Sequence, residues 1–134
     1  MKRVWLLFVV GSILLTAGCA TTQVSPNAVD LAVDFVWQPS DRCSNRSPEI
    51  RVANIPSAAK TLWVKLKDRE VPTWNHGGGN VTYDGSGVIP AGALKNGYNG
   101  PCPPSGSHRY EFTVQAVDAA GVVVGSGKKA LSFP

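Results

Sequence analysis

Two histidines, His76 and His108, are the only imidazole side chains in the sequence, and both lie close to glycines or prolines that restrict the backbone. Asp68 ends a strand-like pattern, and Tyr110 follows His108 by two residues. Loops at the ends of strands are the usual place for binding groups. Imidazolium donates charge-assisted hydrogen bonds, and a nearby carboxylate favours that charged form. A solvated loop histidine and a turn-capping aspartate are the plainer readings of the same residues.

The sequence lacks the common motifs of hydrolases and metalloenzymes. Ser86 lies in DGSGV, which is not the G-x-S-x-G nucleophile elbow, and no helical pattern follows it. Neither H-E-x-x-H nor C-x-x-C occurs, so a zinc site would need His76, His108 and Asp68 to converge without a supporting motif. The three glycines at 77–79 lack the lysine and helix of a phosphate loop. We therefore expect binding without catalysis, with no metal and no cofactor.

The first 18 residues have the pattern of an export signal. Lys2 and Arg3 precede an apolar run over 4–15, which is shorter than the roughly 20 residues of a membrane-spanning helix. The small residues before Cys19 resemble a bacterial lipobox, in which the cysteine receives lipid chains such as palmitate and becomes the mature N-terminus. The alternative is an ordinary secreted protein in which Cys19 has no such role. We expect a signal peptide over 1–18, and a lipidated N-terminus and tether over 19–29.

Location and charge follow from that signal. Ala20 after the cysteine resembles signals for the outer membrane, so we expect a lipid-anchored protein of the bacterial cell envelope, on the periplasmic face of the outer membrane. Removal of Lys2 and Arg3 lowers the formal net charge from +4 to +2. The only remaining run of basic residues is Lys128–Lys129, which does not amount to a nucleic-acid footprint. A protein partner is not indicated by any residue pattern.

Two cysteines, Cys43 and Cys102, remain once Cys19 is assigned to lipid. In an oxidising compartment two such cysteines usually pair, although two separate buried thiols are the alternative. A disulfide between them would close a loop of about 60 residues, which the chain-entropy model values at roughly 4 kcal/mol. For a domain with a small core, this is a large part of the stability.

Alternation of apolar and polar residues, the pattern of half-buried strands, recurs along the chain beyond the tether. We expect strands at 30–37, 49–56, 60–68, 80–83 and 109–118, and one or two closing strands within 122–133. No segment after the signal has a helical period of 3.6 residues. The sequence therefore predicts a single all-β domain over 30–134, with few or no helices.

Two segments carry a family resemblance. GYNGPCPPSGSHRYEFTVQAVD, at 97–118, and CSNRSPEIRVANIPSAAKTLWVKLKDREVP, at 43–72, resemble two motifs of the phosphatidylethanolamine-binding protein family, in the same order. The family's motifs read D-P-D-x-P after a strand, and G-x-Y-x-G-P-x-P-P followed by H-R-Y. The resemblance covers about residues 35–118. It implies a Greek-key β-sandwich with a small pocket for anions and phospholipid headgroups.

The resemblance also implies a set of site residues. Asp68 matches the first aspartate of D-P-D-x-P, and His108 and Tyr110 match H-R-Y. The remaining matches are His76, as the histidine after the first motif, and Tyr98, Pro101 and Pro103, as the pocket wall. This chain departs from the family at Arg69 and Glu70 and in the three glycines after His76, which suggest a loose turn there.

Three functions remain compatible with these residues. The first is a non-catalytic module that binds a small anion, a phosphate group or a phospholipid headgroup. The second is an envelope interaction or inhibitor protein whose pocket is vestigial. The third is a hydrolase that acts through His76 and His108. The absence of a strong nucleophile beside the histidines favours binding over hydrolysis, and we adopt the first function as the working prediction with the second as its alternative.

Overall fold

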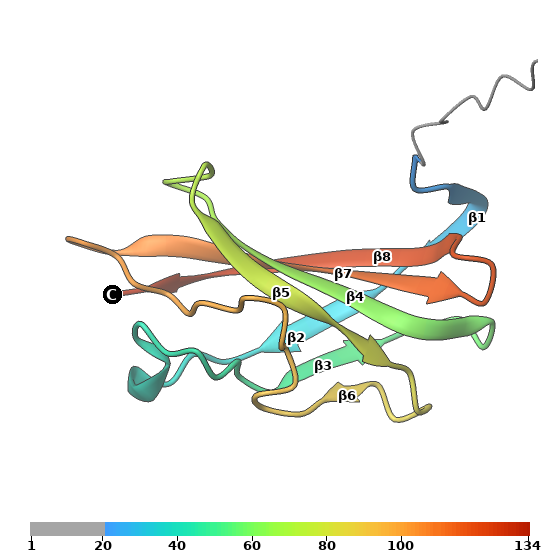
Figure 1. Cartoon of the computed structure of the whole chain (residues 1–134), viewed down its shortest axis with the longest axis horizontal. Coiled ribbons are helices and arrows are strands. Elements are labelled where there is room, and N and C mark those ends of the chain that lie inside the picture. Colours follow the sequence, from blue (N-terminus) through green and yellow to red (C-terminus); the bar gives the residue numbers. More distant parts are fainter. Residues whose placement is uncertain (1–20) are drawn as a thin grey trace, which may run out of the picture.

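The computed structural model describes residues 21–134, which form two β-sheets packed against each other (Figure 1). The strands are β1 (Val24–Asp30), β2 (Ala32–Phe35), β3 (Ile50–Ala53), β4 (Ala59–Asp68), β5 (Asn75–Thr82), β6 (Val88–Ile89), β7 (His108–Asp118) and β8 (Val123–Phe133). One sheet has the order β1-β8-β7-β4-β5 and the other has the order β2-β3-β6. After β5 the chain passes through β6 of the second sheet before β7 returns to pair with β4.

Alternating side chains of the two sheets form the core between them. Leu62, Val64 and Leu66 of β4 point inward, as the alternation predicts, and Phe112 of β7 packs edge-on against Phe35 of β2. The only helical element in residues 21–134 is a short 3-10 turn, η1 (Pro39–Asp41). The expected all-β Greek-key sandwich is confirmed. Within the described part of the chain, no helix is long and apolar enough to cross a membrane.

The sheet begins earlier than the sequence suggests. β1 pairs in parallel with β8, and the pair Val24–Val123 marks its start. The structure therefore replaces most of the expected tether over 19–29 with a strand. Most residues of this edge strand are exposed, so they lack the alternation that would have revealed it. The expected signal peptide and the lipidation site, Cys19, lie outside the described residues.

β5 contains the second correction, because the glycines after His76 are not a loose turn. They belong to a strand of eight residues that includes His76 itself. A Cβ on Gly78 would lie 2.0 Å from the carbonyl oxygen of Val64, and a Cβ on Gly79 would lie 2.9 Å from the Cα of Leu94. The glycines thus allow close packing of backbones, and β5 holds His76 in a fixed position.

Candidate functional site

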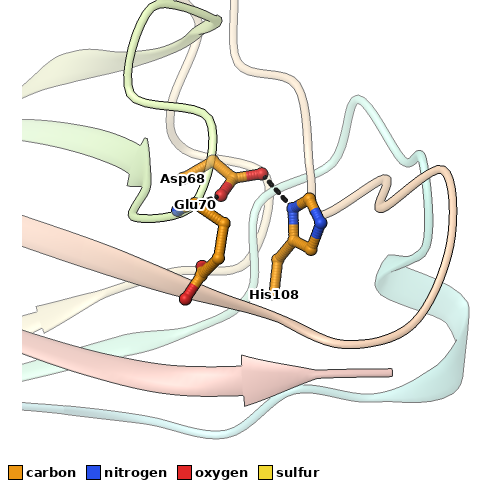
Figure 2. Close-up of side chains that lie close together, drawn as sticks. All are labelled: Asp68, Glu70 and His108. Carbon is orange, nitrogen blue, oxygen red and sulfur yellow. Dashed lines mark hydrogen bonds and ion pairs between the residues drawn. The ribbon is translucent and has the colours of Figure 1, made fainter.

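Asp68 and His108 form a hydrogen-bonded pair between the end of β4 and the start of β7 (Figure 2). The Nδ1–H of His108 donates to the Oδ2 of Asp68 over 2.7 Å. The other carboxylate oxygen, Oδ1, accepts the backbone N–H groups of Glu70 at 2.9 Å and Val71 at 3.0 Å. The loop that follows β4 is therefore wound around the Asp68 carboxylate, which in turn fixes the ring of His108.

The same contacts set the ionisation of Asp68. Burial on its own would raise the pKa of the carboxyl group, because a charged group loses hydration inside the protein. The hydrogen bonds from His108 and from the backbone of Val71 and Glu70 act in the opposite direction and prevail. They hold the pKa of Asp68 below its ordinary value, so the group is a carboxylate at neutral pH.

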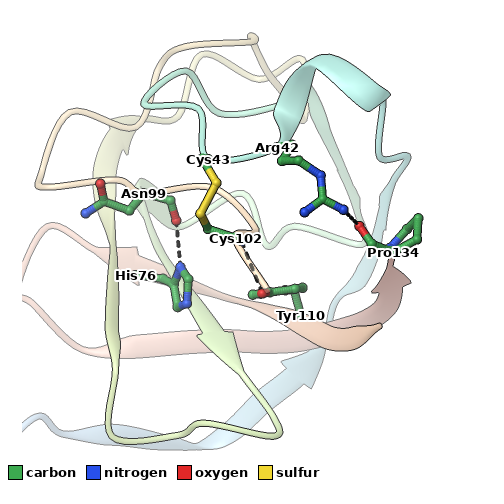
Figure 3. The surroundings of a disulfide bond; sticks show 7 residues. All are labelled: Arg42, Cys43, His76, Asn99, Cys102, Tyr110 and Pro134. Atoms are coloured by element: carbon green, nitrogen blue, oxygen red, sulfur yellow. Dashed lines mark hydrogen bonds between the residues drawn. A yellow bond between two sulfur atoms is a disulfide. The ribbon is translucent and has the colours of Figure 1, made fainter. Parts of the chain in front are cut away.

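His76 lies on the neighbouring strand, β5, and is buried. Its Nδ1–H donates to the carbonyl oxygen of Asn99 over 2.8 Å, which leaves Nε2 as the free ring nitrogen (Figure 3). The ring stands edge-on to that of Tyr110, with centroids 5.3 Å apart, and the ring of His108 stacks over Tyr110 at 6.3 Å. Tyr110 therefore separates the two histidines and sets their spacing.

Tyr110 is itself fully buried, and its hydroxyl accepts the backbone N–H of Cys102 at 3.2 Å. Burial, together with the negative charge of Asp68, raises the pKa of Tyr110 to about 12. The phenol is therefore a neutral hydrogen-bonding group at all physiological pH values. Its hydroxyl fixes the loop before β7, through Cys102, to the buried ring against which both histidines pack.

The expected disulfide between Cys43 and Cys102 is present (Figure 3). Both cysteines are exposed, and their Cα atoms are 4.6 Å apart. The bridge joins the loop after β2 to the loop before β7. Two backbone hydrogen bonds run beside it, from the N–H of Cys43 to Pro101 at 2.8 Å and from Gly100 to Ser44 at 2.7 Å.

A cavity of about 470 Å³ opens between these loops and the β4–β5 loop. Asp68 and His76 line it, as the resemblance implies, and His108 stands behind Asp68 without lining it. The full lining consists of Cys43, Asp68, Val71, Trp74, Asn75, His76, Asn99, Gly100, Cys102 and Pro104. The structure thus gathers the polar candidates at one end of the sandwich, with the disulfide as part of the wall.

The other expected wall residues lie elsewhere. Tyr98 is buried in the core, stacked on Phe112, and Pro101 and Pro103 are buried beside it in the loop. Pro104 lines the cavity in their place. Trp74, Asn75 and Asn99 also line the cavity, and none of them was predicted from the sequence. An aromatic residue two positions before His76, Trp74, is the one sequence signal that could have indicated them.

Asp68, Glu70 and His108 also place three potential metal-ligand atoms within 4.8 Å of one another (Figure 2). Each side chain already has partners in the protein. Asp68 holds His108 and two backbone N–H groups, and Oε2 of Glu70 accepts the N–H of Arg109 at 2.7 Å. The cluster is therefore satisfied by hydrogen bonds within the chain.

Replacement of the carboxylate tests this arrangement. Asp68→Asn is expected to lower the free energy of unfolding by about 1.5–3 kcal/mol at pH 7, the range for hydrogen bonds to charged groups. Because the folded-state pKa is depressed, the contribution is complete above the ordinary value of 3.8 and disappears as the pH falls through the lower folded value. Urea unfolding of both proteins at pH 7 and pH 3 measures this difference. Asp30→Asn, at an exposed position, is the control, and an equal loss at both pH values would exclude a charge effect.

Comparison with known proteins places this arrangement in a family. The family model described as phosphatidylethanolamine-binding protein matches residues 21–133. The chain therefore belongs to the phosphatidylethanolamine-binding protein family, as the two motifs indicated.

Individual relatives support the assignment. The chain is 33% identical over 93 residues to a UPF0098 protein of Methanothermobacter thermautotrophicus, a match that covers 55% of this chain and 62% of the relative. It is 33% identical over 105 residues to the UPF0098 protein YbhB of Escherichia coli, covering 62% of this chain and 66% of that protein. The chain thus spans about two thirds of the length of these relatives.

A solved structure is similar in fold. It is that of CT736 of Chlamydia trachomatis, titled as a homologue of phosphatidylethanolamine-binding proteins, and the match covers 81% of this chain and 98% of the CT736 chain. The TM-score is 0.61 at 20% identity, so this likeness concerns the fold.

Proposed function

We propose that the cavity binds a small anion, in the first place the phosphate group of a phospholipid headgroup, and releases it unchanged. The observation that carries the proposal is the position of His76. Its side chain is buried and lines the cavity, and its Nδ1–H is already bonded to Asn99. Nε2 is therefore the ring nitrogen available to a ligand. When the ring is protonated, this nitrogen donates a charge-assisted hydrogen bond.

The rest of the lining supports an anion with an organic substituent. Asn75 accepts the N–H of Gly77 through its Oδ1, which leaves the amide NH₂ as a donor beside His76. Both oxygens of Asp68 are engaged, so its charge is directed to His108 and the backbone rather than to the ligand. Trp74 and Val71 provide apolar surface at the mouth, which suits the glycerol part of a headgroup.

The nature of the lining favours binding over turnover. The two cysteines that line the cavity are joined to each other, and none of its ten lining residues is a serine, threonine or lysine. Serine, threonine, lysine and free cysteine are common covalent nucleophiles, as is a carboxylate that is free to attack. Asp68 has no such freedom, because His108 and two backbone N–H groups hold it.

Titration with glycerophosphoethanolamine, a phosphodiester with a single negative phosphate charge, tests the proposal. NMR chemical shifts of the residues that line the cavity are expected to report weak binding. His76→Gln is expected to weaken binding about tenfold or more, since it removes the charged donor. His108→Gln is the comparison variant, and its effect should be smaller because His108 does not line the cavity. Shifts that survive undiminished in His76→Gln would exclude the cavity as the anion site.

We further propose that the protein acts from the cell envelope, anchored by lipid at Cys19 on the periplasmic face of the outer membrane. The protein is expected to fractionate with membranes and to move to the soluble fraction when Cys19→Ser prevents lipidation. Immunoblots of both fractions measure the shift, with Cys43→Ser as the control for removal of a different cysteine. Soluble behaviour of the unaltered protein would contradict the anchor.

A further inference from the structure

The outer face of the five-stranded sheet, the side turned away from the three-stranded sheet, carries a group of lysines. Lys65 and Lys67 of β4 and Lys128 of β8 are exposed. Lys65 and Lys128 both pair in register with Thr113 of β7, one from each side. They therefore lie in one row across three strands, about 10 Å apart at the usual strand spacing. Lys67 is two residues along β4 and on the same face.

We call this set the lysine face; it consists of Lys65, Lys67 and Lys128. None of the ion pairs within residues 21–134 involves one of these lysines. Glu111, on the same side of β7, is paired with Arg69. Glu70 lies near the end of the face, where it contacts Arg109 at 3.7 Å. These two acids thus have arginine partners, whereas Asp30 of β1, which pairs in register with Ser126 of β8, lies on the same face at the edge of the sheet. The three lysines outnumber Asp30, so this face keeps a net positive charge.

Exposed aromatic and aliphatic side chains lie at one end of the lysine face. Trp74 is 65% exposed and Val71 is 39% exposed, both in the β4–β5 loop. Figure 1 shows this loop and the residues leading into β1 on the same side of the five-stranded sheet, at opposite ends. The N-terminal entry to the domain, the lysine face and the Trp74 loop therefore all border one surface. Trp63, partly exposed on β4, lies two residues from Lys65 on that surface.

We propose that this surface docks flat on an anionic lipid bilayer, with the lysine face over the headgroups and Trp74 in the interfacial layer. Three lysines without acidic partners match a negative surface, and tryptophan prefers the membrane–water interface. Each basic residue near an anionic surface contributes roughly fivefold in affinity, so the three together contribute on the order of a hundredfold. Docking would also bring Trp74 and Val71, two residues that line the cavity, beside the headgroups.

Lysine labelling on vesicles tests the orientation directly. The full chain is reconstituted in vesicles with about 30% phosphatidylglycerol or in pure phosphatidylcholine. An amine-reactive label is applied, and mass spectrometry quantifies each lysine. Labelling of the lysine face is expected to fall several-fold in the anionic vesicles and to recover when salt is raised to about 0.5 M. Lys95, exposed in the segment between β6 and β7, is the internal control and is expected to label equally in both.

A variant without the three lysines distinguishes docking of the domain on the bilayer from mere attachment of the chain to vesicles. Quenching of Trp74 by brominated lipid, measured as the difference between the unaltered protein and Trp74→Phe, is expected in anionic vesicles. This quenching should be lost in the triple variant Lys65→Gln, Lys67→Gln, Lys128→Gln and kept in Lys95→Gln.

Equal labelling of Lys65, Lys67, Lys128 and Lys95 in both vesicle types would overturn the proposal. Equal protection by a soluble polyanion such as an oligonucleotide would overturn its assignment to a membrane. The proposal does not depend on what the cavity binds, and the phosphodiester titration is read separately without vesicles.

Discussion

Joint replacement of Cys43 and Cys102 by alanine is expected to lower the free energy of unfolding by about 2–5 kcal/mol. The sequence separation of the two cysteines is 59 residues, so their bond removes much freedom from the unfolded chain. Both cysteines are exposed, so loss of their sulfur atoms costs little apolar burial. The effect therefore reports the cross-link itself. The neighbouring hydrogen bonds between Cys43 and Pro101 and between Gly100 and Ser44 should keep the folded loops together.

Urea unfolding of the oxidised protein, the reduced protein and the double variant measures this effect. The reduced protein and the variant are expected to agree, because each lacks only the cross-link. Ser105→Ala, an exposed change in the same loop, is the control and should alter stability by less than about 0.5 kcal/mol. A double variant as stable as the oxidised protein would show that the bridge contributes nothing.

Gly78→Ala is expected to destabilise the domain by about 3 kcal/mol or more, the upper part of the range for overpacking. The added Cβ would lie 2.0 Å from the carbonyl oxygen of Val64, in the backbone of β4. Gly78 cannot move away, because its N–H and C=O are also bonded to Asn96 on its other side at 3.1 and 3.0 Å. The strand that carries His76 is therefore held between two backbones.

Asn80→Ala, two residues along β5 and exposed, is the matched control for this variant and should change stability by about 0.5 kcal/mol or less. Thermal unfolding followed by circular dichroism distinguishes the two variants. A Gly78→Ala protein with the unaltered melting temperature would mean that β5 is as loose as three successive glycines suggest.

Strands were largely predictable from the sequence wherever one face of the strand is buried and the other is exposed to solvent. β4 and β7 have this form, and their alternation located them almost to the residue. β1 and β5 do not have it, because β1 is an exposed edge and β5 consists partly of glycine. The role of glycine in β5 comes from the approach of Val64 and Leu94, which are far from it in sequence. No local pattern encodes such an approach.

The candidate site shows the same division. The two motifs contain Asp68 and His108, and His76 follows the first motif; the structure brings these residues to one end of the sandwich. The choice between Pro101, Pro103 and Pro104 depended on which proline faces the cavity, which the disulfide and the Tyr110–Cys102 hydrogen bond decide. The position of His108 behind Asp68 depended likewise on side-chain geometry rather than on spacing along the chain.

The parallel pairing of β1 with β8 has a consequence for the order of assembly. These are the first and last strands of the described chain, so their contact has nearly the greatest sequence separation that the domain allows. A chain that emerges N-terminus first must leave β1 without its neighbour until β8 has appeared. Cys102 precedes β7 and β8, so its partner Cys43 is within reach before the sheet can close. Oxidation can therefore secure the loops around the cavity while the last edge of the sheet is still open.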